Sequence, residues 1–289
     1  MGRVTNMVNN KQDIELQYYI LNDNVYATAN LKDYDLSVST SVYEVIRVFS
    51  RVPLFEKEHL NRLETSISLL GFSYSPNVEE LQRNIHRLIH LNKVENHNIK
   101  IVINNFDKEE PNIFLFFIKS SYPKHELYKT GVKTILYSTQ RSNPNAKVVM
   151  QQQRQLLNEV ITQHNAYEAL LVDATNSITE GSRSNVFFVK DNTIVTAPSS
   201  DVLVGITRNR VIELCTKHGI AVTEKTINVS FLEEADGLFL TGTSPKILPI
   251  SAVENRSFRS AENSIIVKLM NAYDELIKDY VNNYITPIH

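Results

Sequence analysis

One carboxylate in the sequence is followed by small polar residues and then by an apolar, strand-like run. Glu180 lies in I-T-E-G-S-R-S-N-V-F-F-V, residues 178–189, and another predicted strand, Tyr167–Asp173, precedes this segment. Thr175-Asn176-Ser177 between them has the composition of a turn, which predicts a hairpin. The glycine and serine after Glu180 leave room beside its carboxylate for a flat group. A solvated loop glutamate is the alternative that this stretch leaves open.

Two further segments have the chemistry of a phosphate site. V-G-I-T-R, residues 204–208, opens a predicted helix, whose first backbone N–H groups and dipole favour an anion. Gly205 permits a close approach of the backbone, and Thr207 adds a hydroxyl. T-G-T-S, residues 241–244, is a second loop rich in hydroxyl groups and follows a predicted strand. An ordinary helix cap and an ordinary loop are the alternatives for these two segments.

Two cationic side chains complete the set. Arg62 lies on a predicted helix that is otherwise apolar at Leu60 and Leu63, so its guanidinium is a candidate for binding phosphate or for a solvated position at the surface. Lys147 precedes an apolar V-V-M run at the start of a segment with helical periodicity. A lysine amine in such a setting is able to condense with an aldehyde. A surface lysine is the alternative.

Taken in order, these segments resemble the class IV, or fold type IV, pyridoxal-phosphate aminotransferases. This family includes branched-chain and D-amino acid aminotransferases and the aminodeoxychorismate lyases. The resemblance spans residues 41–249. S-V-Y-E-V-I-R-V-F and P-L-F-E-K-E-H-L-N-R-L are similar to the family's F-E-x-I-R…H-L-x-R-L segment. I-T-E-G-S-R-S-N-V-F-F-V is similar to its E-G-x-x-x-N-hydrophobic signature, and V-G-I-T-R and G-T-S-P-K-I-L-P follow in register.

The resemblance implies roles for individual residues. Lys147 takes the position of the lysine that forms the Schiff base with pyridoxal 5'-phosphate (PLP), and Glu180 that of the carboxylate facing the pyridine nitrogen. The phosphate would be bound by Arg62, Ile206, Thr207 and Thr243. A carboxylate at the ring nitrogen keeps that nitrogen protonated, so the ring accepts the electrons released when the substrate loses its α-proton. The lysine amine then serves as the base that moves this proton.

The chain departs from the family pattern at several positions that would contact substrate. Gln151-Gln152-Gln153 stand where the family commonly has an Asn-Tyr pair after the lysine. Pro245 removes a backbone N–H beside Thr243 and Ser244, where the substrate carboxylate is often held. Residues 100–119 contain no arginine motif of the kind that fixes this carboxylate. The candidate substrate-binding residues are Tyr43, Arg183 and Ser244, with Tyr43 as part of an apolar pocket near Phe49 or Tyr122.

Composition excludes several classes of protein. With 289 residues, 42% of them hydrophobic, and a net charge of −2, the chain is long enough for two domains and has no basic footprint for nucleic acid. No apolar run is long enough to span a bilayer, and the N-terminus has no apolar signal segment. The single cysteine, Cys215, fits the core of a protein in a reducing compartment. These features predict a cytoplasmic protein that binds no metal.

The periodicity predicts an α+β protein of two domains. The small domain, 1–119, would contain strands within 15–31 around an Asn-Asp-Asn turn, strands at 100–104 and 113–119, helices at 58–70 and 78–91, and a segment at 41–49 of either type. Residues 120–129 would be the linker. The large domain, 130–289, would contain helices at 147–164, 207–219, 229–235 and 261–280, strands at 132–137, 167–173, 193–197, 220–227 and 237–240, and a loop at 241–249.

The sequence therefore predicts a fold type IV enzyme, similar to D-amino acid aminotransferase, with a small α+β domain and a larger, barrel-like α/β domain. The resemblance implies a homodimer with PLP held between the domains. The predicted activity is transamination between an amino acid, or an amine, and a 2-oxo acid. Two alternatives stay open: a lyase that converts 4-amino-4-deoxychorismate into 4-aminobenzoate and pyruvate, and a catalytically silent relative that binds the cofactor or a protein partner.

Overall fold

The computed structural model describes residues 14–31, 39–139, 144–149 and 151–285, apart from the side chains of 151–153 and 285. Its contacts divide the chain into two compact units. Unit 1 comprises Met1–Ser120 and Ala146–Gln151, and unit 2 comprises Ser121–Asn145 and Gln152–His289. The segment around Lys147 thus belongs to unit 1, whereas the sequence places it in the domain that begins at residue 130.

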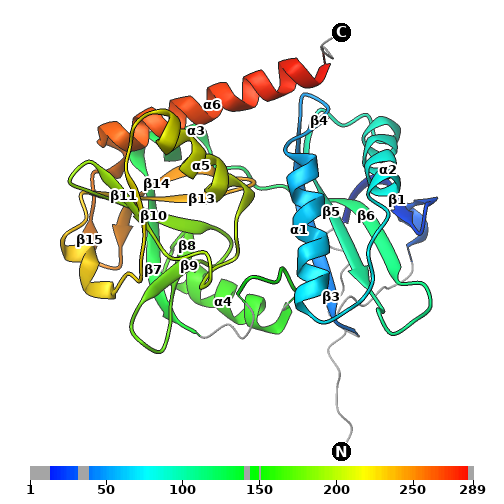
Figure 1. Ribbon diagram of the computed structural model, residues 1–289, viewed down its shortest axis with the longest axis horizontal. Coiled ribbons are helices and arrows are strands. Elements are labelled where there is room, and N and C mark those ends of the chain that lie inside the picture. The colour runs from blue at the N-terminus through cyan, green and yellow to red at the C-terminus, as the bar shows by residue number, and fades with distance from the viewer. Residues whose placement is uncertain (1–13, 32–38, 140–143, 150, 286–289) are drawn as a thin grey trace, which may run out of the picture. The chain divides into compact units, whose positions relative to one another are not determined.

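Unit 1 is built on a six-stranded antiparallel sheet in the order β2-β1-β6-β5-β3-β4 (Figure 1). Its strands are β1 (Ile14–Leu21), β2 (Asn24–Ala27), β3 (Ser41–Phe49), β4 (Val52–Pro53), β5 (Asn96–Asn104) and β6 (Asn112–Ile118). A short 3-10 helix, η2 (Thr28–Asn30), follows β2. The segment 41–49, ambiguous in the sequence, is a strand because each of its residues pairs with one on β5.

Helices α1 (Glu56–Leu69) and α2 (Val78–Leu91) cover one face of this sheet. Their apolar sides carry Leu60, Leu63, Ile67, Leu81, Ile85 and Leu88, and these side chains form one core with alternate residues of the strands, such as Val42, Ile46 and Val48 of β3. Glu44 has the same parity as these β3 residues and therefore points toward the helices. Tyr43 points to the other face, where it joins an aromatic cluster with Phe114 and Phe116.

A short extended segment from later in the chain adds to β3. Val148 forms an antiparallel bridge with Val42, and the backbone N–H of Tyr43 donates to the carbonyl of Lys147 at 3.0 Å. The predicted helix 147–164 is therefore wrong at its start, since α4 begins at Gln151. A local helical period does not reveal that a free strand edge, distant in sequence, pairs with these residues.

Unit 2 contains a nine-stranded mixed sheet, whose path runs β12-β11-β10-β13-β14-β7-β8-β9, with β15 paired to β14. Its strands are β7 (Val132–Ser138), β8 (Glu168–Val172), β9 (Ile178–Gly181), β10 (Asn185–Lys190), β11 (Thr193–Thr196), β12 (Val222–Glu224), β13 (Gly237–Gly242), β14 (Lys246–Val253) and β15 (Arg256–Ser257). Strands β8 and β10 are mostly apolar and buried at almost every position, as expected for a sheet covered on both faces.

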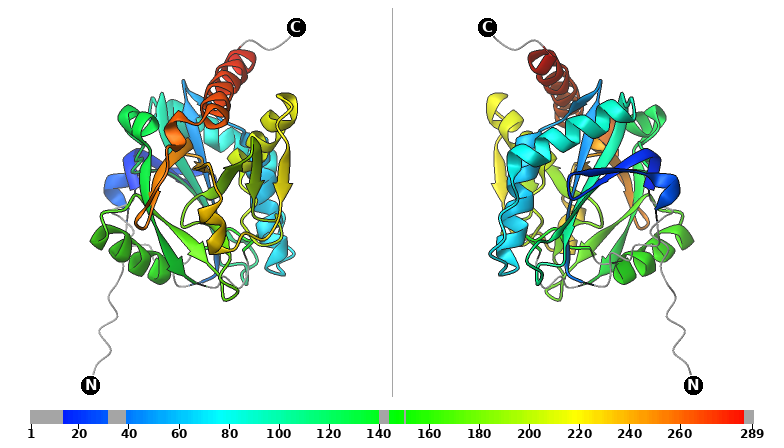
Figure 2. Two further views of the ribbon diagram at one scale, coloured as in Figure 1. Left: turned by 90° about the vertical axis from the view of Figure 1, so that its left-hand side faces the viewer. Right: turned by 90° about the vertical axis from the view of Figure 1, so that its right-hand side faces the viewer.

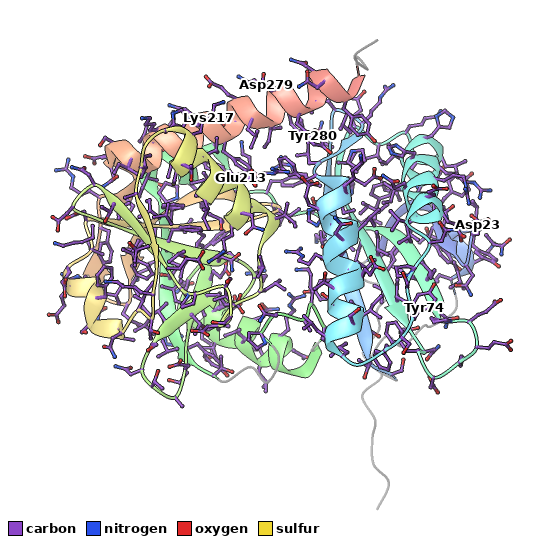
Figure 3. All side chains as sticks on the ribbon, in the orientation of Figure 1. Asp23, Tyr74, Glu213, Lys217, Asp279 and Tyr280 are labelled. Atoms are coloured by element: carbon purple, nitrogen blue, oxygen red, sulfur yellow. The ribbon has the colours of Figure 1, made fainter. Side chains whose placement is uncertain are left out.

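The helices of unit 2 are α3 (His125–Thr130), α4 (Gln151–Gln163), α5 (Ile206–Lys217) and α6 (Ser264–Ile285), with 3-10 helices η3 (Val229–Glu233) and η4 (Ser260–Glu262). Helix α6 packs against α5 and β14 (Figure 2). Glu213 and Lys217, labelled in Figure 3, lie on the exposed side of α5, while Val211 and Leu214 face the core. Among the described residues, no helix is long and apolar enough to cross a membrane.

Most predicted elements agree with the structure, and two segments differ besides the start of α4. The predicted loop 241–249 is the turn of a β-hairpin, because β13 continues to Gly242 and β14 begins at Lys246. Prolines 245 and 249 mask the second strand in the sequence, yet Pro249 lies opposite Phe239 in the register. The predicted linker 120–129 contains most of α3, which is too short to give a clear helical period.

Candidate functional site

In unit 2, two residues of the E-G-S-R-S-N motif hold the segment that leads into α5. Glu180, at the end of β9, is 3% exposed, and its Oε2 accepts the backbone N–H of Leu203 at 3.1 Å. Asn185, at the start of β10, donates from Nδ2 to the carbonyl of the same Leu203 at 2.8 Å. The Glu180 carboxylate and the Asn185 amide thus bind the backbone N–H and the carbonyl of Leu203, just before α5 begins. Asn185 belongs to the motif found in the sequence, but the motif alone did not indicate what this side chain does.

The N-terminus of α5 has the features of an anion site. Gly205 is the residue before the helix, and a methyl group there would come within 2.1 Å of Asn185 Oδ1, so only glycine fits against this amide. Ile206 and Thr207, the first two residues of α5, are buried, and their backbone N–H groups have no partner within the helix. Arg208 anchors this end of the helix by donating from Nη2 to the carbonyl of Ala197 at 3.0 Å and to Glu224 Oε2 at 2.7 Å.

Thr243, also predicted to bind the phosphate, lies in the turn between β13 and β14, next to Ser244. Thr241 pairs with Asn185 in the sheet register, which brings this turn beside the Glu180 motif. A Cβ at Gly242 would lie 3.7 Å from the carbonyl oxygen of Arg183. The turn itself is held by Tyr128, whose hydroxyl donates to the carbonyl of Pro245 at 3.0 Å. Unit 2 thus gathers Glu180, Ile206, Thr207 and Thr243 at adjoining ends of β9, β13 and α5.

Arg183, a predicted substrate residue, lies in the bend between β9 and β10. Its side chain is exposed, and Nη2 donates to the carbonyl of Tyr167 at 3.3 Å. Its backbone N–H donates to Glu168 Oε1 at 2.6 Å. The guanidinium therefore lies near Tyr167, the residue that precedes β8. A contact between Arg183 and the substrate stays a prediction.

In unit 1, Arg62 lies in a buried ionic cluster that the sequence does not predict. Its Nε donates to Glu44 Oε1 at 2.7 Å and its Nη2 to Glu44 Oε2 at 2.8 Å. His59, one turn earlier on α1, has Nδ1 at 2.8 Å from Glu44 Oε2. The signal for this cluster is present in the sequence: Glu44 shares the parity of the buried β3 residues, and His59 and Arg62 are three positions apart on one helix.

The charges in this cluster set its protonation. Burial raises the pKa of Glu44, but the Arg62 guanidinium and the hydrogen bonds from Arg62 and His59 outweigh burial and hold that pKa well below its ordinary value of 4.5. Burial lowers the pKa of His59. The hydrogen bond and the negative charge of Glu44 raise this pKa, but they do not compensate fully for the lowering. Because ionised Glu44 only accepts hydrogen bonds, Nδ1 of the neutral imidazole is the protonated nitrogen. Arg62 and Glu44 are therefore both charged and form a buried ion pair.

Lys147 lies beside the same strand. Its backbone N–H donates to Ser66 Oγ of α1 at 3.3 Å, and its Nζ lies 4.8 Å from the centre of the Tyr43 ring. A second amine, Lys100 Nζ on β5, lies 5.2 Å from the same ring centre and 5.9 Å from that of Phe116. Unit 1 thus brings the Lys147 amine onto the ring of Tyr43, while Arg62 lies on α1, at the face of the sheet that Glu44 points to. It also adds Lys100, a cation within residues 100–119, where the sequence has no arginine motif.

Comparisons with known proteins identify the family of the chain. Residues 41–253 match the family model of the class IV amino-transferases. The chain belongs to this family. It is a PLP-dependent aminotransferase of fold type IV, as the sequence predicts.

Individual relatives are similar over most of their length. The chain is 24% identical over 250 residues to D-alanine aminotransferase of Bacillus licheniformis, which covers 83% of this chain and 88% of the relative. A T.th. branched-chain amino acid aminotransferase, solved with pyridoxamine 5'-phosphate, has a TM-score of 0.83 at 24% identity and covers 92% and 96% of the two chains. A putative 4-amino-4-deoxychorismate lyase from Legionella pneumophila has a TM-score of 0.75 at 24% identity and covers 81% and 90%. The last two likenesses show the fold.

The residues present suit PLP by their chemistry. A buried carboxylate, an amine seated on an aromatic ring, a guanidinium and a helix N-terminus with glycine before it match the ring nitrogen, the aldehyde and the phosphate of this cofactor. The side chains of Gln151–Gln153, which replace the usual Asn-Tyr pair, lie outside what the structure describes.

Proposed function

We propose that this aminotransferase moves an amino group between an amino acid and a 2-oxo acid, with Lys147 as its catalytic residue. The observation that carries the proposal is the position of the Lys147 amine on the face of Tyr43, beside the strand that also bears Glu44. Two backbone hydrogen bonds, to Ser66 and from Tyr43, fix the main chain of Lys147. A catalytic amine needs such a defined position, since misplaced groups lose most of their effect.

Each residue then has a defined task. Glu180 would offer an acceptor to the pyridine nitrogen and keep that nitrogen protonated, while Arg62, Thr207, Thr243 and the first amides of α5 would bind the phosphate. When bound, PLP supplies an electron-accepting ring. With PLP bound, the Lys147 amine would take the proton from the α-carbon of the substrate and give it back later in the same turnover.

The substrate carboxylate is the second part of the proposal. Lys100 places a cation on the same aromatic ring as Lys147, on the sheet face opposite α1 and α2. A cation beside an apolar ring favours an anion whose body is apolar, as in a typical amino acid or 2-oxo acid. Tyr43 provides the apolar surface, and Ser244 and Arg183 are further candidates for this carboxylate. We also propose a cytoplasmic homodimer.

The first experiment is an absorption spectrum of the purified protein with PLP, before and after single amino acids of both chiralities are added. We expect a visible band that depends on Lys147 and is converted by one class of donor. Lys147→Ala should lose this band and lower kcat by at least about 100-fold, whereas Lys133→Ala, at an exposed lysine of β7, should change neither. Full turnover by Lys147→Ala without an added amine would refute the assignment.

The same assay distinguishes the lyase. Pyruvate released from aminodeoxychorismate without an amino acceptor, together with a band that no amino acid converts, would identify the lyase activity in place of transamination. No band with PLP under any condition would favour the silent relative.

Substitution of Lys100 tests the proposed carboxylate site. We expect Lys100→Met to raise KM for the 2-oxo acid by about 10- to 100-fold, the value of one hydrogen bond to a charged group, with a smaller change in kcat. Lys100→Arg should restore most of the affinity, and the apolar Met preserves packing against Phe116. An unchanged KM in Lys100→Met would place the carboxylate elsewhere.

A further inference from the structure

Unit 2 contains a buried carboxylate to which the proposed function assigns no task. Glu168, the first residue of β8, is 2% exposed and lies in the sheet beside β9. Its Oε1 accepts two hydrogen bonds, from the backbone N–H of Arg183 at 2.6 Å and from the hydroxyl of Ser184 at 2.9 Å. Both donors belong to residues 181–184, the last residue of β9 and the three that lead to β10, here called the 181–184 bend.

The rest of this bend is shaped around the carboxylate. The N–H of Gly181 donates to the carbonyl of Ser184 at 2.7 Å, and that of Ser182 to Ala169 on β8 at 2.8 Å. A methyl group at Gly181 would come within 2.5 Å of Glu168 Oε1 and 2.2 Å of Ser184 Oγ. Glycine is therefore needed here because the carboxylate and the hydroxyl occupy the space of a side chain.

The bend lies between the two residues that hold Leu203. Glu180 precedes it and accepts the N–H of Leu203, and Asn185 follows it and donates to the carbonyl of Leu203. A change in the bend alters the separation and direction of these two side chains together. We propose that Glu168 is a positioning residue, which holds the 181–184 bend and thereby fixes Glu180 and Asn185 against the segment leading into α5.

The hydrogen bonds define what Glu168 must supply. Both contacts need an acceptor at Oε1, and the carbonyl oxygen of a glutamine amide provides one in the same place. Burial raises the pKa of Glu168, while the nearby Arg183 charge and the hydrogen bonds from the 181–184 bend oppose this shift. A positioning role depends on the acceptor and not on the charge. Glu168→Gln should therefore rescue what Glu168→Ala loses.

The first test is hydrogen exchange of the protein without added PLP, so that it does not depend on the proposed activity. In Glu168→Ala we expect faster exchange both in peptides covering 181–185 and in peptides covering 202–206, which contain Leu203. Glu168→Gln should exchange like the wild type. Glu56→Ala is the matched control, because Glu56 is also buried, at 3%, but lies on α1 of unit 1. Unchanged exchange at 202–206 in Glu168→Ala would overturn the proposal.

The second test links the bend to Glu180 and rests on the proposed function. Leaving two buried donors without an acceptor should weaken PLP binding by about 10- to 100-fold in Glu168→Ala, with less than about 3-fold change in Glu168→Gln or Glu56→Ala. In the Glu180→Ala background the same substitution should have a much smaller effect, as expected for residues that act through one another. Fully additive losses would overturn the positioning role.

The outcomes separate the two proposals. A wild type that binds no PLP would refute the proposed function, while the exchange experiment still decides on Glu168. Should Glu168→Ala fail to fold, Ser184→Ala removes only one of the two hydrogen bonds, and we expect faster exchange in the same two peptides to a smaller extent. Faster exchange at 181–185 alone would again overturn the proposal.

Discussion

Two buried glutamates, one in each unit, differ in the partners that the fold gives them. Glu44 on β3 is fully buried and receives a two-pronged contact from the Arg62 guanidinium. Glu168 on β8 is equally buried, but its close donors are a backbone N–H and a hydroxyl, both neutral. The pKa of Glu44 is lowered and that of Glu168 is raised, although burial acts in the same direction on both.

The difference shows that burial alone does not determine the charge of a carboxyl group. A full opposite charge in direct contact outweighs the loss of hydration, whereas neutral hydrogen bonds do not, even with the Arg183 charge nearby. In unit 1 the arginine proposed to bind phosphate is thus held by an ionised partner. In unit 2 the corresponding support is a network of hydrogen bonds through the backbone, from Glu168 to the 181–184 bend and on to Leu203.

The largest effect should follow from removing the cation of the first pair. We expect Arg62→Met to lower the free energy of unfolding by about 3–5 kcal/mol, because it leaves a buried carboxylate without its counter-charge. Denaturant unfolding measures this value. Arg51→Ala is the control: its contact with Glu95 at 2.9 Å is exposed, with side chains 72% and 64% accessible, so its loss should cost less than about 1 kcal/mol.

Equal losses in Arg62→Met and Arg51→Ala would contradict the comparison, since buried and exposed pairs would then contribute alike. A loss of PLP affinity in Arg62→Met without any loss of stability would likewise show that the buried Glu44 carboxylate does not need Arg62 as its counter-charge.

A smaller effect should appear in the pH dependence of stability, with opposite signs for the two glutamates. The lowered pKa of Glu44 stabilises the folded state above the ordinary value of 4.5, and this contribution is lost as the pH falls below it. The raised pKa of Glu168 acts in reverse: its contribution is fully present below 4.5 and is lost as the pH rises from there toward the raised value. Each slope is limited to about 1.4 kcal/mol per pH unit.

Urea unfolding of the wild type, Glu44→Gln and Glu168→Gln between about pH 3 and pH 8 isolates these terms as differences between proteins. The free energy of unfolding of Glu44→Gln, taken relative to the wild type, should increase as the pH falls below 4.5. That of Glu168→Gln, taken in the same way, should increase as the pH rises above 4.5. Slopes of the same sign would mean that the two carboxyls share one protonation behaviour.

The sequence by itself determined the family, the cofactor and most local elements. The four motifs and the match of residues 41–253 point to the same fold, and α2 and β3 have the predicted bounds, with only the type of β3 left open. Helical periods, turn residues and short motifs are properties of neighbouring residues, so a linear reading detects them. The same reading named Glu180 and the N-terminus of α5 as partners of one ligand.

Only the tertiary structure decided which distant residues share a cluster. The pairing of Glu44 with Arg62 depends on which face of β3 meets α1, and the position of Lys147 depends on a free edge of β3 about a hundred residues earlier. Lys100 reaches Tyr43 because β5 pairs with β3 in one register. Strand register and helix orientation are set by the packing of the whole core, and a slip of β3 by one residue would turn Glu44 and Tyr43 to the opposite faces of the sheet.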